Sequence, residues 1–384
     1  MKDAVVGGYR RARRGIAVAG MAAALLGVAT GGVFAAGGSY GKAEQVGVGD
    51  YKYGASTYAI NVGDYVYQYA NGEDGYAYYT YYDGEKWSDW VSWPEDQPAK
   101  VKYDPAPVEY QDNNYVFYTG DDGHLYHLSG AVDSDWTWDD YSGDFQFKYA
   151  PYANENDEYL YLYGTSKEGY LYVKQYDGKE WTDWKNVSGE SYSAYEPYSV
   201  EYDEYENVFW TSDDGKVYWN RYDGKEWAEP KALPGDYEFE YAPYAVEYAP
   251  EKSLYAYAVT KDGAPAWNVF DGKKWSGWKA YDGLEAKVTY QPNAYVYNDV
   301  QHLVFTGADG HAYYTEYAGE WTDDWADLGE NYAYDPYQYS YGDNLYLTYT
   351  GKDGYAYYKT YAAGGGDDDD DTGYEPTPTE ESDY

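Results

Sequence analysis

The chain alternates short aromatic or aliphatic stretches with turn residues, and within each stretch apolar and polar side chains alternate. Residues 206–211 read Glu-Asn-Val-Phe-Trp-Thr, and residues 216–222, after Asp214 and Gly215, read Lys-Val-Tyr-Trp-Asn-Arg-Tyr. A period of two predicts β-strands. The Asp-Gly pair between the two stretches supplies the positive φ that a tight hairpin requires. A second Asp-Gly turn at Asp223 leads to a further strand that begins at Trp227. The pattern therefore predicts antiparallel strands joined by hairpins.

The same hairpin signal recurs seven times, at intervals of 44 to 48 residues. Its glycines are Gly75, Gly123, Gly169, Gly215, Gly263, Gly310 and Gly354. A fixed period of this size is typical of propellers and solenoids, and four antiparallel strands per repeat make a propeller blade. The sequence therefore predicts an all-β fold over residues 37–363. We expect a seven-bladed β-propeller of four-stranded antiparallel blades, with almost no helix after residue 36.

The seventh repeat stops at Tyr361 without a fourth strand. Aligning the N-terminal segment with the other repeats places Gln45 to Val48 where a fourth strand ends. We therefore predict that this segment pairs with the third strand of the last blade, around Gly354 to Tyr361. Closing the ring in this way leaves no open sheet edge.

Aromatic residues replace the usual aliphatic core. The chain has 60 Tyr, 15 Trp and no Cys, so disulfides cannot support it. Buried Tyr and Trp still need hydrogen-bond partners for their polar tips. Most fourth strands carry two tryptophans: Trp87 with Trp90, Trp136 with Trp138, Trp181 with Trp184, Trp275 with Trp278, and Trp321 with Trp325. These side chains either wedge between blades or expose a face to a ligand, and the second tryptophan of each pair is the candidate for exposure.

The two ends of the chain differ from the repeats. Residues 1–36 combine a basic cluster with a run of small and apolar residues, which predicts a secretory signal peptide and a secreted or cell-surface protein. Twin-arginine export and an uncleaved membrane anchor stay open as alternatives. Residues 364–384 begin with three Gly and five Asp and predict a disordered acidic tail.

The formal charge of −41 limits the partners. It becomes about −45 once residues 1–36, with five basic and one acidic side chains, are removed. A field of that sign repels nucleic acid and anionic lipid. We expect no nucleic-acid partner and no membrane insertion after cleavage of the signal.

No catalytic residues, metal ligands or cofactors are predicted. A sialidase needs several arginines to hold the substrate carboxylate, and the chain after residue 36 has only Arg221. No carboxylate departs from the repeat pattern, although hydrolase or lyase activity stays open. His124 and His127 lie three apart on a predicted strand and face opposite sides, whereas His124 and His311 share one repeat position beside a turn. These histidines do not predict a metal site.

The repeat resembles a known family. The motifs Thr-x-x-Asp-Gly-x-x-Tyr and Tyr-Asp-Gly-x-x-Trp-Ser/Thr-x-Trp resemble the blade repeat of the bacterial seven-bladed propeller lectins, the PLL-like fucose-binding family, over residues 40–363. The resemblance implies a multivalent lectin that binds fucose and related sugars at equivalent sites between neighbouring blades.

The topology places the Asp-Gly turns and the connections between blades on one face, where they would line a pocket at each blade junction. The candidate ligand-binding residues there are Trp90, Trp184, Tyr195, Asp214, Tyr241, Asp262, Trp278 and Asp309. Aromatic faces and a few polar groups suit small neutral sugars, and several weak sites on one disc give avidity for a cell-surface glycan or a secreted polysaccharide. The alternative is a structural or protein-binding propeller of the cell envelope. The sugar, the number of sites and the oligomeric state stay open.

Overall fold

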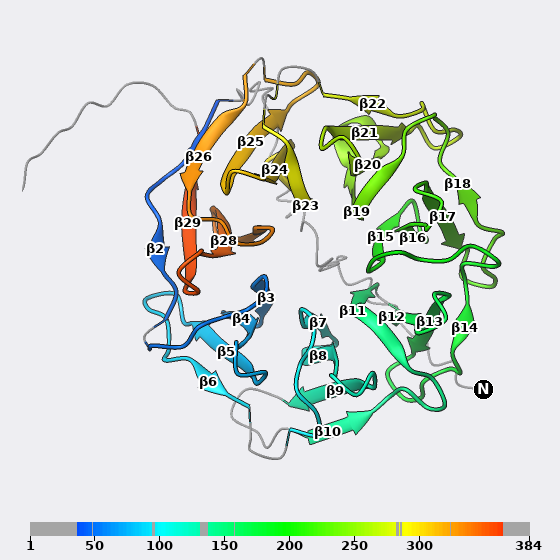
Figure 1. Ribbon diagram of the computed structural model, residues 1–384, viewed down its shortest axis with the longest axis horizontal. Coiled ribbons are helices and arrows are strands. Elements are labelled where there is room, and N and C mark those ends of the chain that lie inside the picture. Colours follow the sequence, from blue (N-terminus) through cyan, green and yellow to red (C-terminus); the bar gives the residue numbers. More distant parts are fainter. Residues whose placement is uncertain are drawn as a thin grey trace, which may run out of the picture.

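Seven sheets stand around a central axis (Figure 1), as the repeats predict. This computed structural model describes residues 37–47, 49–93, 97–130, 137–156, 158–281, 284, 286–322 and 324–363. The expected signal peptide and acidic tail, together with Val48 and Trp136, lie outside the described residues. The helical content of the described residues is one 3₁₀ turn, η1 (Ala249–Glu251), and these residues contain no helix that is long and apolar enough to cross a membrane.

In six blades all four strands, and in the last blade the first three, follow chain order from the axis outward, and neighbouring strands are antiparallel. The first strands are β3 (Tyr58–Val62), β7 (Ala106–Tyr110), β11 (Phe147–Glu155), β15 (Tyr198–Tyr202), β19 (Phe239–Tyr248), β23 (Val288–Tyr297) and β27 (Tyr337–Tyr341). The second strands are β4 (Tyr65–Asn71), β8 (Asn113–Thr119), β12 (Leu160–Ser166), β16 (Tyr205–Thr211), β20 (Ser253–Thr260), β24 (Val300–Gly307) and β28 (Asn344–Thr350).

The outer half of each blade is less regular than the inner half. The third strands are β5 (Ala77–Tyr82), β9 (Leu125–Gly130), β13 (Leu171–Tyr176), β17 (Val217–Tyr222), β21 (Pro265–Phe270), β25 (His311–Tyr317) and β29 (Ala356–Ala362). The fourth strands are β6 (Val91–Ser92), β10 (Thr137–Asp140), β14 (Lys185–Asn186), β18 (Lys231–Ala232), β22 (Lys279–Ala280) and β26 (Ala326–Glu330). Several are shorter than the sequence predicts. Trp227, for example, forms an isolated bridge with Tyr222, and β18 begins only at Lys231.

The N-terminal segment closes the last blade, which confirms the predicted closure. Strand β2 (Glu44–Gln45) pairs with Tyr358 and Tyr357 of β29. A second strand, β1 (Ser39–Tyr40), pairs further along β29 with Ala362 and Tyr361, and the sequence did not reveal it. The two short strands together cover most of the edge that β29 would otherwise expose.

A belt of backbone hydrogen bonds joins neighbouring blades on the face that carries the Asp-Gly turns, here called the turn face. At every junction the turn glycine of one blade accepts a bond from the connection that enters the next blade. The pairs are Val101–Gly75 (2.9 Å), Phe147–Gly123 (2.7 Å), Ser193–Gly169 (2.7 Å), Phe239–Gly215 (2.7 Å), Val288–Gly263 (2.8 Å), Tyr332–Gly310 (3.1 Å) and Tyr53–Gly354 (2.8 Å). The predicted placement of turns and connections on one face is therefore confirmed.

A second belt runs on the opposite face and is made of tyrosine hydroxyls. A tyrosine at the end of a first strand donates to a backbone carbonyl in the first turn of the next blade. The pairs are Tyr110–Glu158 (2.9 Å), Tyr202–Lys252 (2.7 Å), Tyr248–Asp299 (2.9 Å), Tyr297–Asp343 (2.5 Å) and Tyr341–Asp64 (2.7 Å). Each hydroxyl therefore finds the partner that burial of the ring demands.

Between the two belts, buried tyrosines of the second strands bond to a polar side chain of the next blade. Tyr257 donates to Gln301 at 2.6 Å, and Tyr163 donates to Glu206 at 2.8 Å. Glu206 is almost fully buried and also accepts from Asn154 at 3.0 Å. Its burial raises the pKa of the carboxyl to about 7, although these hydrogen bonds favour the charged form and lower the pKa in part.

The raised pKa of Glu206 predicts a pH-dependent stability. A carboxyl whose pKa is higher in the folded state stabilises the fold fully below its unfolded value of 4.5, and this contribution is lost as the pH rises toward about 7. We expect Glu206→Gln to remove from the pH profile of the unfolding free energy a decline on the order of 3 kcal/mol between these values. Urea unfolding from pH 4.5 to 8 measures it. The exposed Glu226→Gln is the control, and equal slopes for both variants would contradict the assignment.

Candidate functional site

The predicted aspartates lie exposed on the turn face, where they also support their own turns. Asp214 accepts hydrogen bonds from the backbone of Lys216 at 2.9 Å and from the hydroxyl of Tyr218 at 3.2 Å. Asp309 accepts the equivalent bonds from His311 at 3.0 Å and Tyr313 at 2.7 Å. Each carboxylate thus ties the turn to the tyrosine of the third strand.

The turn of Asp262 is built differently. Here the side chain of Thr260 accepts the backbone N–H of Ala264 at 3.0 Å, and the third strand has Ala266 where the other blades have tyrosine. The side chain of Asp262 is exposed. Among the predicted aspartates, Asp262 has the fewest hydrogen bonds to its own turn.

The first tryptophan of the pairs that the structure describes, and the single Trp227, lie as wedges between blades. Each ring packs against an aromatic ring on a second or third strand of the preceding blade. The contacts, as distances between ring centroids, are Trp87–Tyr358 (6.0 Å), Trp181–Phe117 (6.0 Å), Trp227–Tyr163 (6.2 Å), Trp275–Phe209 (5.9 Å) and Trp321–Tyr257 (6.3 Å). These tryptophans fill the junctions between blades.

The second tryptophans pack against the chain that leads into their own blade. Trp90 is 5% exposed and donates to the carbonyl of Val46 at 2.8 Å, and Trp278 is 7% exposed and lies 4.5 Å from the ring of Phe239. Trp184 is half-buried and donates to the carbonyl of Tyr141 at 2.9 Å. Of these three predicted residues, Trp184 offers the most ring surface to a ligand.

Tyr195 and Tyr241 belong to a structure that the sequence did not reveal. Six tyrosines that precede the first-strand prolines stand side by side in blade order, with centroid distances of 6.0 to 6.5 Å between neighbours. They are Tyr103, Tyr149, Tyr195, Tyr241, Tyr290 and Tyr334, here called the tyrosine ring. All six are half-buried. Contacts that run from the second blade to the seventh at this short spacing place the ring around the central axis on the turn face.

A layer of polar side chains follows the tyrosine ring, because the next residue is polar in four of the six repeats: Asp104, Glu196, Gln291 and Asp335. Asp335 accepts hydrogen bonds from Ser56 at 2.8 Å and from Gln291 at 2.9 Å. Asp104, Glu196 and Gln291 line a cavity of about 40 Å³. Its other lining residues are Tyr58, Pro105, Ala106, Pro107, Ala150, Pro151, Tyr152, Ala153, Pro197, Tyr198, Tyr244 and Tyr337.

The carboxyls of this layer are shifted toward their neutral forms. Burial raises the pKa of Asp104 well above its ordinary value, and the charges of Asp335 and Glu196 raise it further. Burial raises the pKa of Glu196 to about 7. Near neutral pH these groups therefore offer O–H donors as well as acceptors, which suits a ligand rich in hydroxyl groups.

Three members of the tyrosine ring have strained backbones. Tyr149, Tyr241 and Tyr290 have φ values of 71°, 69° and 63°. Each lies in a bulge where the pairing of the first strand with the second is interrupted. A positive φ is unusual for a bulky residue and costs on the order of 1–3 kcal/mol, and such residues cluster at functional sites.

A recurring Tyr-x-Pro marks this site in the sequence. The triplet occurs at 103–105, 149–151, 195–197, 241–243, 290–292 and 334–336. Read only as the start of a strand, it predicts extended backbone. These tyrosines meet near the axis only when the seven blades form a closed circle. Closure brings together six residues that lie about 46 residues apart in the chain.

The histidines of the repeat position beside the turn pair with aspartates of the fourth strand. His124 Nδ1 lies 2.7 Å from Asp140, and His311 Nδ1 lies 3.0 Å from Asp327. The part of the chain that the structure describes contains no group of three His, Cys, Asp or Glu side chains that could hold a metal ion.

No known protein family matches the sequence, and no curated protein matches it either. Solved structures do match the fold. The BP39L lectin from Burkholderia pseudomallei superposes with a TM-score of 0.69 at 14% identity, covering 83% of this chain and 98% of that chain. BBS1N, solved in complex with ARL6DN, gives a TM-score of 0.56 at 12% identity over 84% of this chain and 96% of its own. The fucose-specific lectin from Aleuria aurantia gives 0.50 at 11% identity over 73% and 96%. The resemblance to propeller lectins is thus confirmed for the fold.

The strained backbone predicts a difference between two matched variants. Tyr195 and Tyr241 are both half-buried and each contacts two ring neighbours, but only Tyr241 has a positive φ. Glycine accepts positive φ without strain. We therefore expect Tyr241→Gly to cost less unfolding free energy than Tyr195→Gly, by on the order of 1 kcal/mol. Guanidinium unfolding measures both, and an equal or reversed order would show that the strain is absent.

The burial of the second tryptophans predicts unequal costs of truncation. Trp278→Ala leaves a large cavity against Phe239, and we expect it to lower the unfolding free energy by roughly 3–5 kcal/mol. Trp184→Ala should cost clearly less, because that ring is half-buried. Thermal and urea unfolding of both variants test this ranking. A loss at Trp184 as large as that at Trp278 would assign both rings the same packing role.

Proposed function

We propose that this protein is an exported carbohydrate-binding propeller that binds neutral sugars on its turn face without catalysis. The observation that carries the proposal is the tyrosine ring next to the layer of Asp104, Glu196 and Asp335. Tyrosine faces pack against sugar C–H groups, while carboxyls and amides bond to hydroxyls. The solved lectins that share the fold support the same function class.

Side-chain exposure also favours the turn face. Four of the five exposed large hydrophobic side chains among the described residues are tyrosines in its turns or blade connections. They are Tyr51, Tyr76, Tyr192 and Tyr237. These rings are accessible to a ligand that approaches the turn face. The strong negative charge of the chain disfavours anionic ligands at this surface.

The cavity limits how a sugar would sit. A volume of about 40 Å³ holds one or two waters but no pyranose ring. The sugar would therefore lie on the tyrosine ring and direct hydroxyl groups toward the carboxyl layer. The predicted sites between blades, with Trp184 and Asp262 as their most accessible residues, would add weak contacts on the same face and give avidity for a multivalent glycan.

The second candidate function is a structural or protein-binding propeller of the cell envelope. BBS1N, which shares the fold, was solved in complex with a protein partner. The exposed tyrosines of the turn face suit such a partner as well. The two functions differ in whether the isolated propeller binds any glycan.

A glycan array on residues 37–363, followed by titration calorimetry with the best ligand, tests the proposal. We expect the double variant Tyr195→Ala/Tyr241→Ala to weaken binding at least tenfold, about 1.4 kcal/mol, while thermal unfolding shows a folded propeller. Trp184→Ala is the matched control between blades and should keep most of the affinity. EDTA should leave binding unchanged.

The opposite pattern would move the site. Loss of binding in Trp184→Ala together with full binding in the double variant would place the ligand between blades. A folded parent protein that binds no glycan would overturn the carbohydrate proposal and leave the envelope propeller.

A further inference from the structure

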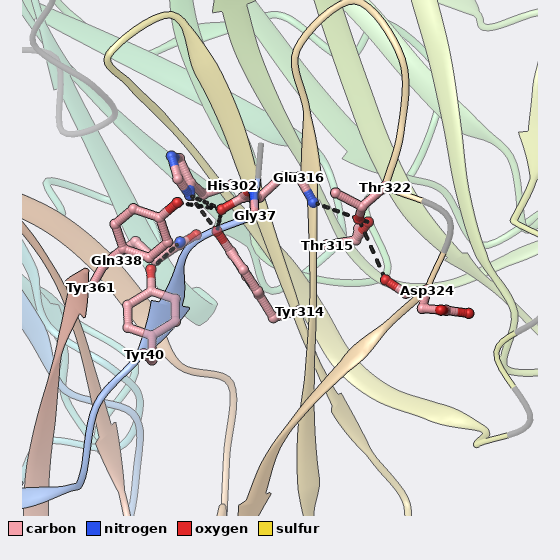
Figure 2. A network of polar contacts seen from close by, with 10 residues as sticks. All are labelled: Gly37, Tyr40, His302, Tyr314, Thr315, Glu316, Thr322, Asp324, Gln338 and Tyr361. Atoms are coloured by element: carbon pink, nitrogen blue, oxygen red, sulfur yellow. Dashed lines mark hydrogen bonds and ion pairs between the residues drawn. The ribbon is translucent and has the colours of Figure 1, made fainter. Parts of the chain in front are cut away.

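Gly37 makes a contact at the end of the segment that closes the propeller. The backbone nitrogen of Gly37 donates a hydrogen bond to Oε2 of Glu316 at 2.6 Å. Glu316 lies on β25, in the sixth blade, and is 1% exposed. Figure 2 shows the carboxylate at the centre of a polar network, with Gly37 on one side and the rings of Tyr314 and Tyr361 on the other.

The other oxygen of Glu316 is already saturated with neutral donors. The hydroxyls of Tyr314 and Tyr361 both donate to Oε1, the latter at 2.5 Å. The hydrogen bond of Gly37 is the one that the structure gives to Oε2. This carboxylate thus binds two hydroxyls at one end and a single backbone nitrogen at the other.

A positive partner would stabilise a buried carboxylate of this kind. An isolated buried charge is costly unless it is paired and hydrogen-bonded. Among the described residues, the one ion-pair partner within 4 Å of Glu316 is His302, at 3.8 Å. Burial lowers the pKa of His302 to about 4, so it is neutral at physiological pH. Nothing else in the described part of the chain supplies a cation there.

The segment that delivers Gly37 is fitted closely to its surroundings. A Cβ atom at Gly38 would lie 2.1 Å from the hydroxyl oxygen of Tyr361 and 2.5 Å from the carbonyl oxygen of Ala362. Two residues on, the hydroxyl of Tyr40 accepts a bond from Gln338 at 2.7 Å, and its ring makes an edge contact with Tyr314. Only glycine at position 38 allows this approach, so the position of the Gly37 nitrogen is specified by the fold.

We infer that proteolytic processing between Ala36 and Gly37 places the new α-ammonium group of Gly37 on Glu316, and that this ion pair completes the closure of the propeller. The nitrogen in the structure is the amide of the unprocessed chain and stands in for that ammonium. The inference rests on the export in the proposed function and is independent of sugar binding.

The covalent step is a peptide hydrolysis by an export-associated peptidase. Water adds its hydroxyl to the carbonyl carbon of Ala36, the C–N bond to Gly37 breaks, and the nitrogen takes a proton. At neutral pH the free amine takes up a second proton and becomes an ammonium, since an α-amino group has a pKa of about 7.7–8.0. One neutral donor thereby becomes a cation 2.6 Å from a buried carboxylate oxygen.

The first test compares two forms of the described propeller. One begins at Gly37. The other begins with the native Ala35 and Ala36, so that its N-terminal ammonium lies on Ala35 and away from Glu316. We expect the Gly37 form to have a Tm higher by several degrees. Glu316→Gln should abolish the difference between the two forms, as a double-mutant cycle requires. Mass spectrometry of the exported full-length chain should find Gly37 at the terminus.

Two glycine variants separate this docking from general damage to the strand. Gly38→Ala should lower the Tm of the Gly37 form, because its Cβ would collide with Tyr361. Gly41→Ala is the matched control, since its Cβ would meet the nearest atom, the carbonyl oxygen of Thr360, at an ordinary 3.5 Å. Glycan binding is not a readout in these experiments, so failure here leaves the proposed function untouched.

The pH dependence and the reactivity of the amine give independent readouts. Pairing with Glu316 raises the folded-state pKa of the ammonium, so the Tm advantage should be full below about pH 7.7 and disappear as the pH rises through that raised value. His302, Tyr40, Tyr314 and Tyr361 also face the group, and His302 is already neutral in this range.

Acetic anhydride, followed by peptide mass spectrometry, should modify the Gly37 amine more slowly than the Ala35 amine of the longer form. This comparison needs no variant at Glu316 and holds even where Glu316→Gln does not fold. Equal Tm values and equal amine reactivity in the two forms, or a mature terminus elsewhere, would overturn the inference.

Discussion

The hydroxyl of a buried tyrosine is the constraint on which this propeller depends. An aliphatic core needs only apolar neighbours, whereas burying a tyrosine ring is costly where its hydroxyl finds no polar partner. In several cases the partner lies in the next blade, as with Tyr202 and the carbonyl of Lys252, or Tyr257 and Gln301. Packing and hydrogen bonding therefore act between the same pairs of blades. The ring holds together without disulfides because its core residues are also its connectors.

The last blade is the exception in this ring, because there the two ends of the chain have to be joined. Every other junction joins two blades whose strands are continuous in the chain, but the last blade has to recruit its outer strands from the N-terminus. There the structure uses the same chemistry at higher density. Tyr40, Tyr314 and Tyr361 converge on Glu316 and Gln338, and Gly37 adds the remaining donor. Closure thus depends on polar contacts of exact position rather than on a long strand pair.

Local and periodic sequence patterns predict most of the fold but little of the site. Hairpin turns, alternation and the 44- to 48-residue period determine seven blades, and the missing strand after Tyr361 predicts the closure, because each of these signals is local or periodic. The tyrosine ring is different. Tyr195 is a sound candidate from its repeat position, but its neighbours Tyr149 and Tyr241 reach it only across blade junctions. The same holds for Glu316, whose partners come from both ends of the chain. Sequence reasoning misses contacts that exist only after the ring has closed.

The two faces of the propeller differ in which residues have positive φ values. On the face of the tyrosine hydroxyl belt, positive φ values occur in the first turns, as at Asp203, Lys252 and Asp299, and not at tyrosines. On the turn face, three tyrosines have strained backbones, and carboxyls stand close together with pKa values raised by burial. Glycine in place of Tyr149, Tyr241 or Tyr290 would relieve the backbone strain. An amide in place of Glu196 would remove a buried carboxyl. These costly features lie at one end of the central axis, which is the end where we propose that a sugar binds.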